Sequence, residues 1–210
     1  MIFPAIEKQR VNSLSAKSLK KLFESARPEW SLAESAGRLV EISGSGAAAS
    51  LTFAFRLVLQ AQQQGEPAGW VTSFDSFFYP PDAAQAGVDL DALVVVHVPD
   101  IQAVSQAGEK LLRSGAFGLV ALDIGVGDIP MALQARLAAL AQQHHTALIC
   151  LTEKEERAMS LGSLISLRVH ARRTRTSEDR LECELKILKD KRRGPTWSQT
   201  EICCGPAGLC

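Results

Sequence analysis

"LVEISGSGAAASLTFAFRLVLQ", residues 39–60, is the stretch that decides the fold. An apolar run typical of a buried strand leads into a turn that contains Gly44 and Gly46, and a long apolar run typical of a helix follows. Nucleotide-binding proteins place their phosphate loop in such a strand–turn–helix unit. No lysine occurs in these residues, so the stretch has the architecture of a phosphate loop without its central charge.

A phosphate loop of the form G-x-x-x-x-G-K-[ST] uses backbone N–H groups, a lysine and a hydroxyl to hold phosphates and magnesium. Counting from Gly44 puts Ala49 in place of the second glycine and Ser50 in place of the lysine. Counting from Gly46 puts Leu51 in place of the second glycine and Thr52 in place of the lysine. On spacing alone, an ordinary strand-to-helix turn is the favoured interpretation. The degenerate loop consists of Gly44, Ser45, Gly46, Ala49, Ser50, Leu51 and Thr52.

Strand-like and helix-like runs alternate along the chain on either side of this unit. Strands are predicted at residues 38–43, 69–74, 93–98, 118–123 and 147–152. Helices are predicted at 47–63, 102–114 and 130–144, with a short one near 81–87. Because the strands are continuously apolar, we expect a mostly parallel central sheet covered by helices on both faces, in an α/β fold.

The pattern changes after about residue 165. The runs "SLRVHAR" (166–172) and "LECELKILK" (181–189) alternate polar and apolar residues, which predicts an antiparallel hairpin with one wet face. We expect three parts: an N-terminal helix and linker (1–36), a core (37–194), and an edge strand with a flexible tail (195–210).

The composition argues against several classes of function. The 23 basic and 23 acidic residues cancel, so no global field favours nucleic acid or membrane. Five cysteines without a CxxC motif are typical of free thiols in a reducing compartment. With no signal peptide and no apolar run of about 18–20 residues, we expect a soluble cytoplasmic protein. The four histidines have no metal spacing, and no hydrolase or metalloprotease motif occurs, so we expect neither a metal nor an enzyme.

One carboxylate has a position typical of nucleotide sites. Asp123 ends the apolar run "FGLVALD", where a strand-terminal acid can act through magnesium beside a phosphate loop. A helix cap or a solvated strand end is the simpler alternative.

Taken in order, these segments resemble the ATPase core of RecA, over about Gly37 to Ile202. The resemblance rests mainly on "GVDLDAL" (87–93) and "LLRSGAFGLVALD" (111–123), with "GRLVEISG" (37–44) and "LKILKDKRRGP" (185–195) beside them. It implies a RecA-like fold and makes Asp123 a vestigial Walker B residue.

The departures from RecA concern its ATP chemistry. The resemblance puts Phe77 where RecA has its catalytic glutamate, and Glu153 where RecA has a nucleotide-sensing glutamine. The two DNA-contacting loops correspond to the short segments "IGVGDIP" (124–130) and "EKEERAMSLG" (153–162). We therefore expect no ATP cofactor and no ATP-driven filament assembly.

A short RecA-like chain without these residues is most similar to the ImuA family, and its length and near-complete core separate it from the shorter division inhibitor SulA. The ImuA resemblance implies a non-catalytic adaptor in the bacterial DNA-damage response. Its implied partners are the ImuB polymerase-like factor of mutagenic translesion synthesis and RecA itself, which the adaptor would modulate or inhibit. A SulA-like inhibitor of division and a weak, atypical DNA-binding ATPase remain alternatives.

Two surfaces are candidates for binding partners. RecA protomers join through an N-terminal element that residues 13–36 resemble in position, so the apolar residues Leu19, Leu22 and Phe23 are predicted anchors; packing of this helix on its own core is the alternative. The hairpin carries a basic set, with "KDKRR" (189–193) predicted to face "ARRTR" (171–175) across it. This set would contact DNA or an acidic partner, or form a solvated face. It consists of Arg172, Arg173, Arg175, Lys189, Lys191, Arg192 and Arg193.

Overall fold

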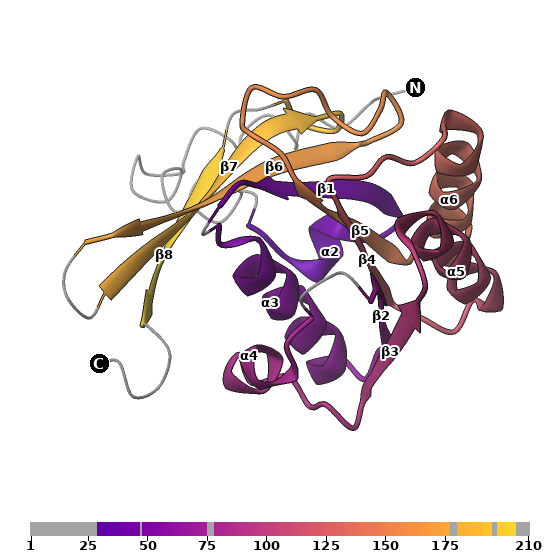
Figure 1. Ribbon diagram of the computed structural model, residues 1–210, viewed down its shortest axis with the longest axis horizontal. Coiled ribbons are helices and arrows are strands. Elements are labelled where there is room, and N and C mark those ends of the chain that lie inside the picture. Colours follow the sequence, from indigo (N-terminus) through magenta and orange to yellow (C-terminus); the bar gives the residue numbers. More distant parts are fainter. Residues whose placement is uncertain (1–28, 47, 75–77, 177–179, 195–196, 205–210) are drawn as a thin grey trace, which may run out of the picture.

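In the computed structural model, the described residues form a sheet of eight strands with helices on both faces (Figure 1). The structure describes residues 29–46, 48–74, 78–176, 180–194 and 197–204. The strands are β1 (Arg38–Gly44), β2 (Ala68–Ser73), β3 (Leu93–Val98), β4 (Leu119–Gly125), β5 (Ala147–Glu153), β6 (Leu167–Arg175), β7 (Arg180–Asp190) and β8 (Ser198–Cys204). The described helices are α2 (Leu32–Ser35), α3 (Ser50–Gln63), α4 (Pro80–Gln85), α5 (Ile101–Ser114) and α6 (Met131–His144).

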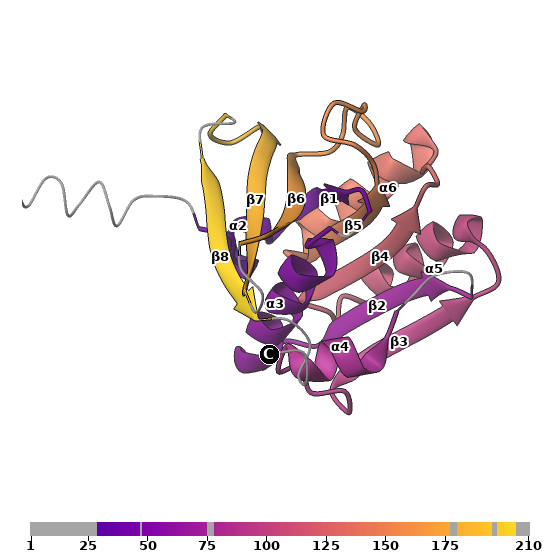
Figure 2. The ribbon, with the colours of Figure 1, turned by 60° about the vertical axis from the view of Figure 1, so that its left-hand side comes forward.

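The strand order is β3-β2-β4-β5-β1-β6-β7-β8. Strands β1 to β6 pair in parallel, and β7 and β8 pair antiparallel with their neighbours. Figure 2 shows the antiparallel strands at one end of the sheet and β2 and β3 at the other. This confirms the predicted α/β class, with a mostly parallel sheet and an antiparallel C-terminal hairpin.

Two hydrophobic cores lie on opposite faces of the sheet because the parallel strands are apolar on both sides. Helix α3 packs on one face, where Phe55, Trp70 and Phe78 form an aromatic cluster with ring centroids 5.1–6.2 Å apart. Helices α5 and α6 lie side by side on the other face (Figure 1).

The segment just before β1 is part of the first core. Trp30 is fully buried, and its indole N–H donates to the Phe53 carbonyl of α3 at 3.0 Å. Its backbone N–H donates to Gln199 of β8 at 2.8 Å, so one residue joins the beginning and the end of the described chain. The Ser31 side chain then caps α2 by accepting from the Glu34 N–H.

Helix boundaries agree with the sequence to within a few residues, and the differences have local causes. Helix α3 begins at Ser50 instead of 47, because the residues after Gly44 form the turn and Ala49 has a non-helical ψ of 16°. The short helix expected at 81–87 begins at Pro80, since prolines fit the first turn, where no N–H donor is needed.

Candidate functional site

The carboxyl ends of the parallel strands meet at one edge of the sheet and form a cleft of about 710 Å³. Open α/β sheets bind their ligands at this edge. The cleft is the place where the structure brings together residues that are far apart in the sequence. The sequence-predicted residues that line it are Gly44, Gly46, Ser50, Leu51, Asp123 and Glu153.

The other residues of the degenerate loop lie outside this cleft. Ala49 is fully buried beneath the start of α3, and Ser45 lines a smaller hollow of about 380 Å³ beside β6. The Thr52 hydroxyl accepts a hydrogen bond from Arg173 of β6 at 3.1 Å, so it contributes to packing between α3 and the hairpin. The spacing argument could not separate these positions from those that line the cleft.

The turn between β1 and α3 is tight. A Cβ placed on Gly44 would lie 2.4 Å from the Ala48 Cβ and 2.5 Å from the Ser50 Oγ, so these two side chains fill the space in front of Gly44. Gly46 has φ +61°, in the left-handed region that glycine adopts without strain. Helix α3 starts without a capping side chain, and its positive dipole end, roughly half a charge, faces the cleft.

The charged groups among the described residues that line the cleft are acidic. Among its described lining residues are the carboxylates Asp100, Asp123 and Glu153, with no lysine or arginine. The Thr72 hydroxyl donates to Asp123 at 3.4 Å, and Asp100 caps α5 by accepting from the Ala103 N–H at 2.8 Å. The described lining of the cleft thus combines three carboxylates with the partial positive charge of the helix end.

The loop after β5, residues 154–166, is held by a buried carboxylate that the sequence reasoning missed. Glu41 of β1 is fully buried and accepts from Ser160 Oγ at 2.6 Å and from the Leu161 N–H at 3.1 Å. The Arg168 guanidinium lies 3.6 Å away and donates to the Ala158 carbonyl in the same loop. An acid inside the apolar run "LVEIS" was the available signal, because buried carboxylates require partners.

The second anchor of this loop comes from α6. Gln134 is 2% exposed and donates from its amide nitrogen to the carbonyls of Ile129 and Leu161 at 2.7 and 2.9 Å. It therefore ties the segments after β4 and after β5 together. These are the two segments that the RecA resemblance aligns with DNA-contacting loops.

The predicted pairing of the two basic clusters across the hairpin is wrong. Residues 171–175 lie next to the hairpin turn, and the register pairs Arg172 with Glu184. Lys189 pairs with Arg168 at the open end, so the clusters occupy opposite ends of the hairpin. In an antiparallel pair, distance from the turn decides which residues face each other, and the charge pattern carried no information about that distance.

The basic residues at the open end of the hairpin are engaged within the molecule. Lys191 donates to the Ser163 carbonyl at 2.6 Å, and Arg193 pairs with Glu34 of α2 at 2.8 Å. Arg192 reaches the Ala36 carbonyl at 3.3 Å, and Lys189 lies 3.4 Å from the Ser163 carbonyl. These side chains support the loop and the entry segment, although three of the four remain exposed.

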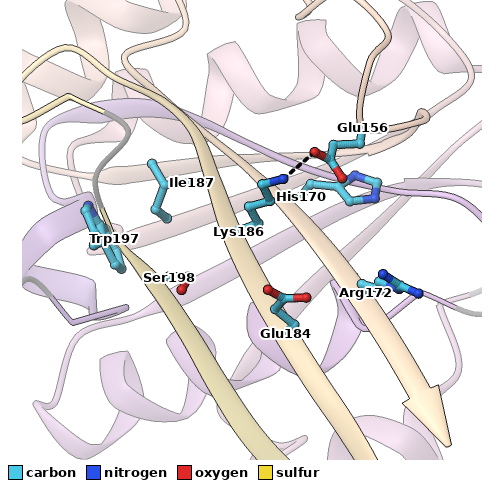
Figure 3. A pocket seen from close by; sticks show the side chains of 8 residues that line it. All are labelled: Glu156, His170, Arg172, Glu184, Lys186, Ile187, Trp197 and Ser198. Carbon is cyan, nitrogen blue, oxygen red and sulfur yellow. Dashed lines mark hydrogen bonds and ion pairs between the residues drawn. The ribbon is translucent and has the colours of Figure 1, made fainter.

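A second hollow, of about 500 Å³, lies on the outer face of the hairpin (Figure 3). Lys186 pairs with Glu156 at 2.6 Å, and Arg172 and Glu184 lie beside this pair. The Lys186 hydrogen bond lowers the pKa of Glu156. Burial lowers the pKa of His170, so its imidazole is neutral at physiological pH. Two cations and two carboxylates balance there, which makes this face less basic than the hairpin sequence suggests.

Several expectations fall on residues that lie outside the described part of the chain. They are the predicted anchors Leu19, Leu22 and Phe23, and Phe77 at the position aligned with the catalytic glutamate. Within the described ranges, no group of three or more His, Cys, Asp or Glu residues is arranged to hold a metal ion. No helix among the described residues is long and apolar enough to cross a membrane.

Comparison with known proteins agrees with the fold. Residues 6–157 match the family described as the RecA N-terminal domain. The chain is 26% identical over 197 residues to the protein RecA of Bifidobacterium breve, covering 76% of this chain and 50% of that protein. It is 27% identical over 193 residues to the protein RecA of Frankia casuarinae, covering 74% and 56%.

The chain spans about half the length of the curated relatives it matches. A third relative, the protein RecA of Treponema denticola, is 31% identical over 125 residues, covering 54% of this chain and 30% of that protein. The family match extends over well more than half of the chain and includes both the β1–α3 turn and Asp123. The chain therefore belongs to the RecA N-terminal domain family.

Proposed function

We propose that this chain is a non-catalytic, RecA-like adaptor of the bacterial DNA-damage response. It acts in the cytoplasm, supports mutagenic translesion synthesis by an ImuB-like polymerase factor, and contacts RecA. The observation that carries the proposal is the charge of the cleft at the carboxyl ends of the parallel strands. This cleft is lined by three carboxylates and, among described residues, by no cation. Losing the cationic partners of bound phosphates weakens nucleotide binding by several kcal/mol, on the order of a thousandfold.

A nucleotide titration tests the non-catalytic part of this proposal. We expect calorimetry with excess magnesium to detect no ATP binding tighter than about 1 mM, and the thermal midpoint to stay unchanged. The RecA protein of Bifidobacterium breve serves as the positive control in the same buffers. Micromolar binding or measurable hydrolysis by this chain would contradict the proposal.

One of the two edges of the sheet, at β3, supports a contact with a RecA-like partner. In the described part of the chain, β3 pairs only with β2, and the side chains of Val94 and His97 are exposed on it. An edge strand of this kind can pair with a strand from another protein. The RecA resemblance places a protomer-joining element in residues 13–36, and we propose that this element and the β3 edge are the two halves of the contact.

Removing residues 1–28 tests the docking element. This truncation is cleaner than a deletion to residue 36, because Trp30 and α2 are packed in the core. We expect the truncated chain to keep its circular dichroism spectrum and thermal midpoint, and to lose binding to immobilised RecA. Unchanged RecA binding would refute the docking role of this segment.

An effect on RecA is a further part of this proposal. A chain that docks like a RecA protomer without an ATP cycle stops filament growth where it binds, so we propose that it inhibits RecA. In a strand-exchange assay, excess chain should slow RecA, and the chain lacking residues 1–28 should not. Normal strand exchange in the presence of excess chain would overturn this part of the proposal.

Partner capture from lysates of damaged bacteria tests the adaptor role as a whole. Recovery of an ImuB-like factor and RecA is the expected result. Recovery of the tubulin-like division protein instead would favour a SulA-like function.

Direct DNA contact is a separate proposal, which rests on Arg172 and its neighbours near the hairpin turn. Arg172→Glu should lower DNA affinity and its salt dependence if this face binds phosphates.

A further inference from the structure

A groove lies between helices α5 and α6. These helices cover the face of the sheet opposite α3 (Figure 1). The volume of the groove is about 520 Å³, and none of its lining residues belongs to the cleft or to the hairpin hollow. We refer to it as the α5–α6 groove. The lining residues that matter here are Glu109, Lys110, Arg113, Ala132, Leu133 and Arg136.

One carboxylate holds two arginines from different helices in this groove. Glu109 Oε1 accepts from Arg113 Nε at 3.1 Å and Nη2 at 2.7 Å, and its Oε2 accepts from Arg136 Nη2 at 3.3 Å. The Glu109 side chain is 14% exposed, whereas those of Arg113 and Arg136 are 61% and 58% exposed. Glu109 therefore holds both guanidinium groups in place, while more than half of each arginine side chain stays exposed to solvent, where N–H donors remain available.

The groove has a surplus of positive charge. It contains three cations (Lys110, Arg113 and Arg136) and the single carboxylate Glu109 among its described lining residues. The hydrogen bond from Arg113 lowers the pKa of Glu109, so this carboxylate stays ionised and keeps both arginines in place at neutral pH. After Glu109 is paired, a net charge of about +2 remains for a ligand.

The start of α6 adds to this preference for anions. Pro130 occupies the cap position and offers no side-chain acceptor, and both Pro130 and Ala132 line the groove. The positive end of the α6 dipole therefore faces the same space as the arginines. Leu133, 7% exposed, supplies an apolar floor next to them.

We propose that the α5–α6 groove binds an acidic segment of a partner protein, through Arg113 and Arg136 positioned by Glu109. Arginine forks bind carboxylates with two parallel hydrogen bonds, and an adjacent apolar floor suits a peptide with an apolar residue beside its acids. The chain's own residues 1–28 are not the occupant, because they carry six Lys/Arg and two Asp/Glu. Nucleic acid fits less well, since no aromatic side chain is among the described residues that line the groove, and base stacking needs one.

The test uses the full-length chain and a fluorescein-labelled peptide rich in Asp and Glu with a central leucine, followed by fluorescence anisotropy. The peptide with Asn and Gln in place of its acids is the control probe. We expect the acidic peptide to bind, with an affinity that falls as salt rises, and the neutral peptide not to bind.

Charge-reversal variants distinguish binding in the groove from attraction of the peptide by the net charge of the protein. Arg113→Glu with Arg136→Glu should weaken binding by about tenfold or more, the loss expected for at least one charge-assisted hydrogen bond. Arg157→Glu with Arg180→Glu makes the same change in net charge at exposed positions outside the groove, and should change affinity by less than about twofold. Arg113→Lys with Arg136→Lys keeps the charge without the forks and should give an intermediate loss, even if the glutamate variant fails to fold.

Three outcomes would overturn the proposal. Equal losses in the two glutamate pairs would show binding by net charge alone. Stronger competition by a single-stranded oligonucleotide than by the acidic peptide would identify a nucleic-acid surface. Equal displacement of the peptide by inorganic phosphate at the same concentration would show that any small anion satisfies the arginines. None of these results bears on the nucleotide titration of the cleft.

Discussion

At the scale of single residues, two buried carboxylates hold the ends of distant segments together. Glu41 joins β1 to the loop after β5, and Asp190 of β7 pairs with Arg38 of β1 at 2.6 Å. Both ion-pair side chains of the Arg38–Asp190 contact are at most 2% exposed. A buried ion pair of this kind adds little to the stability of the fold when compared with an apolar pair in the same place. Removing only one partner lowers the stability strongly, because a buried charge is left without its counter-charge.

Glu41→Gln should lower the free energy of unfolding by about 3–5 kcal/mol, because Arg168 would lose its buried counter-charge. Urea unfolding followed by circular dichroism measures this change. Glu156→Gln is the matched control: its pair with Lys186 is about half exposed, so the expected cost is under about 1 kcal/mol. Similar costs for the two variants would contradict the anchoring role of Glu41.

The Asp190 carboxylate should make stability depend on pH in acid. Burial alone would raise its pKa, but hydrogen bonds from the Arg192 N–H at 2.9 Å and from Arg38 outweigh burial and hold that pKa below its ordinary value. A lowered pKa in the folded state contributes stability that is complete above the unfolded value of about 3.9 and is lost as pH falls through the folded value.

We expect Asp190→Asn to be less stable than the parent chain at neutral pH and to lose less stability between about pH 5 and pH 2. Urea unfolding at a series of pH values measures this difference. Asp82→Asn, at an exposed position in α4, should keep the pH profile of the parent chain. Identical acid profiles for Asp190→Asn and the parent would refute the assignment.

At the scale of elements, the β1–α3 turn is built by close packing. Ala48 and Ser50 fill the space in front of Gly44, whereas nothing lies within 4 Å of a Cβ added to Gly46. The two glycines are therefore needed for different reasons, one for lack of space and the other for its left-handed backbone.

Gly44→Ala should cost about 1–3 kcal/mol by overpacking, and Ala48→Gly in the same chain should recover part of this loss. Gly46→Ala should cost about 1–2 kcal/mol through backbone strain, and Ala48→Gly should not restore it. Thermal unfolding of the four variants distinguishes the two causes. Equal rescue of both glycine variants would contradict the packing argument.

At the scale of the whole molecule, one sheet separates two cores that share no helix. Cys150 lies in the core beneath α5 and α6, and Cys183 lies in the core beneath α3 at the antiparallel end. Both thiols are buried, and burial raises the pKa of Cys150 far above its ordinary value. Neither thiol can react with a reagent until its own core opens.

These two thiols report whether the cores unfold together. In a chain with Cys203, Cys204 and Cys210 changed to serine, we expect both to be labelled at the same urea concentration, because Trp30 links α3 to β8 across the described chain. Mass spectrometry of labelled peptides measures each site. Labelling of Cys183 well before Cys150 would show that the antiparallel end opens as a separate unit.

By itself, the sequence determined the fold class, most strand boundaries and the position of the glycine-containing turn between β1 and α3. These follow from hydrophobic periodicity and turn chemistry, which act over a few residues. It also indicated Asp123, since an acid at the end of an apolar run is a local feature, although β4 continues to Gly125. The partners of Glu41 could not be predicted, because Ser160 and Leu161 reach it only after the loop folds back on β1.

Only the tertiary structure decided the charge of the cleft, the separation of the two basic clusters and the existence of the α5–α6 groove. Each depends on which strand ends or helix faces become neighbours across long stretches of chain, and a net charge counted along the sequence does not contain that arrangement. Glu109 and Arg136 illustrate the limit, because they meet only when α5 and α6 pack on the same face of the sheet. The residues within each segment determined its secondary structure, and the packing of these helices and strands determined which residues share a surface.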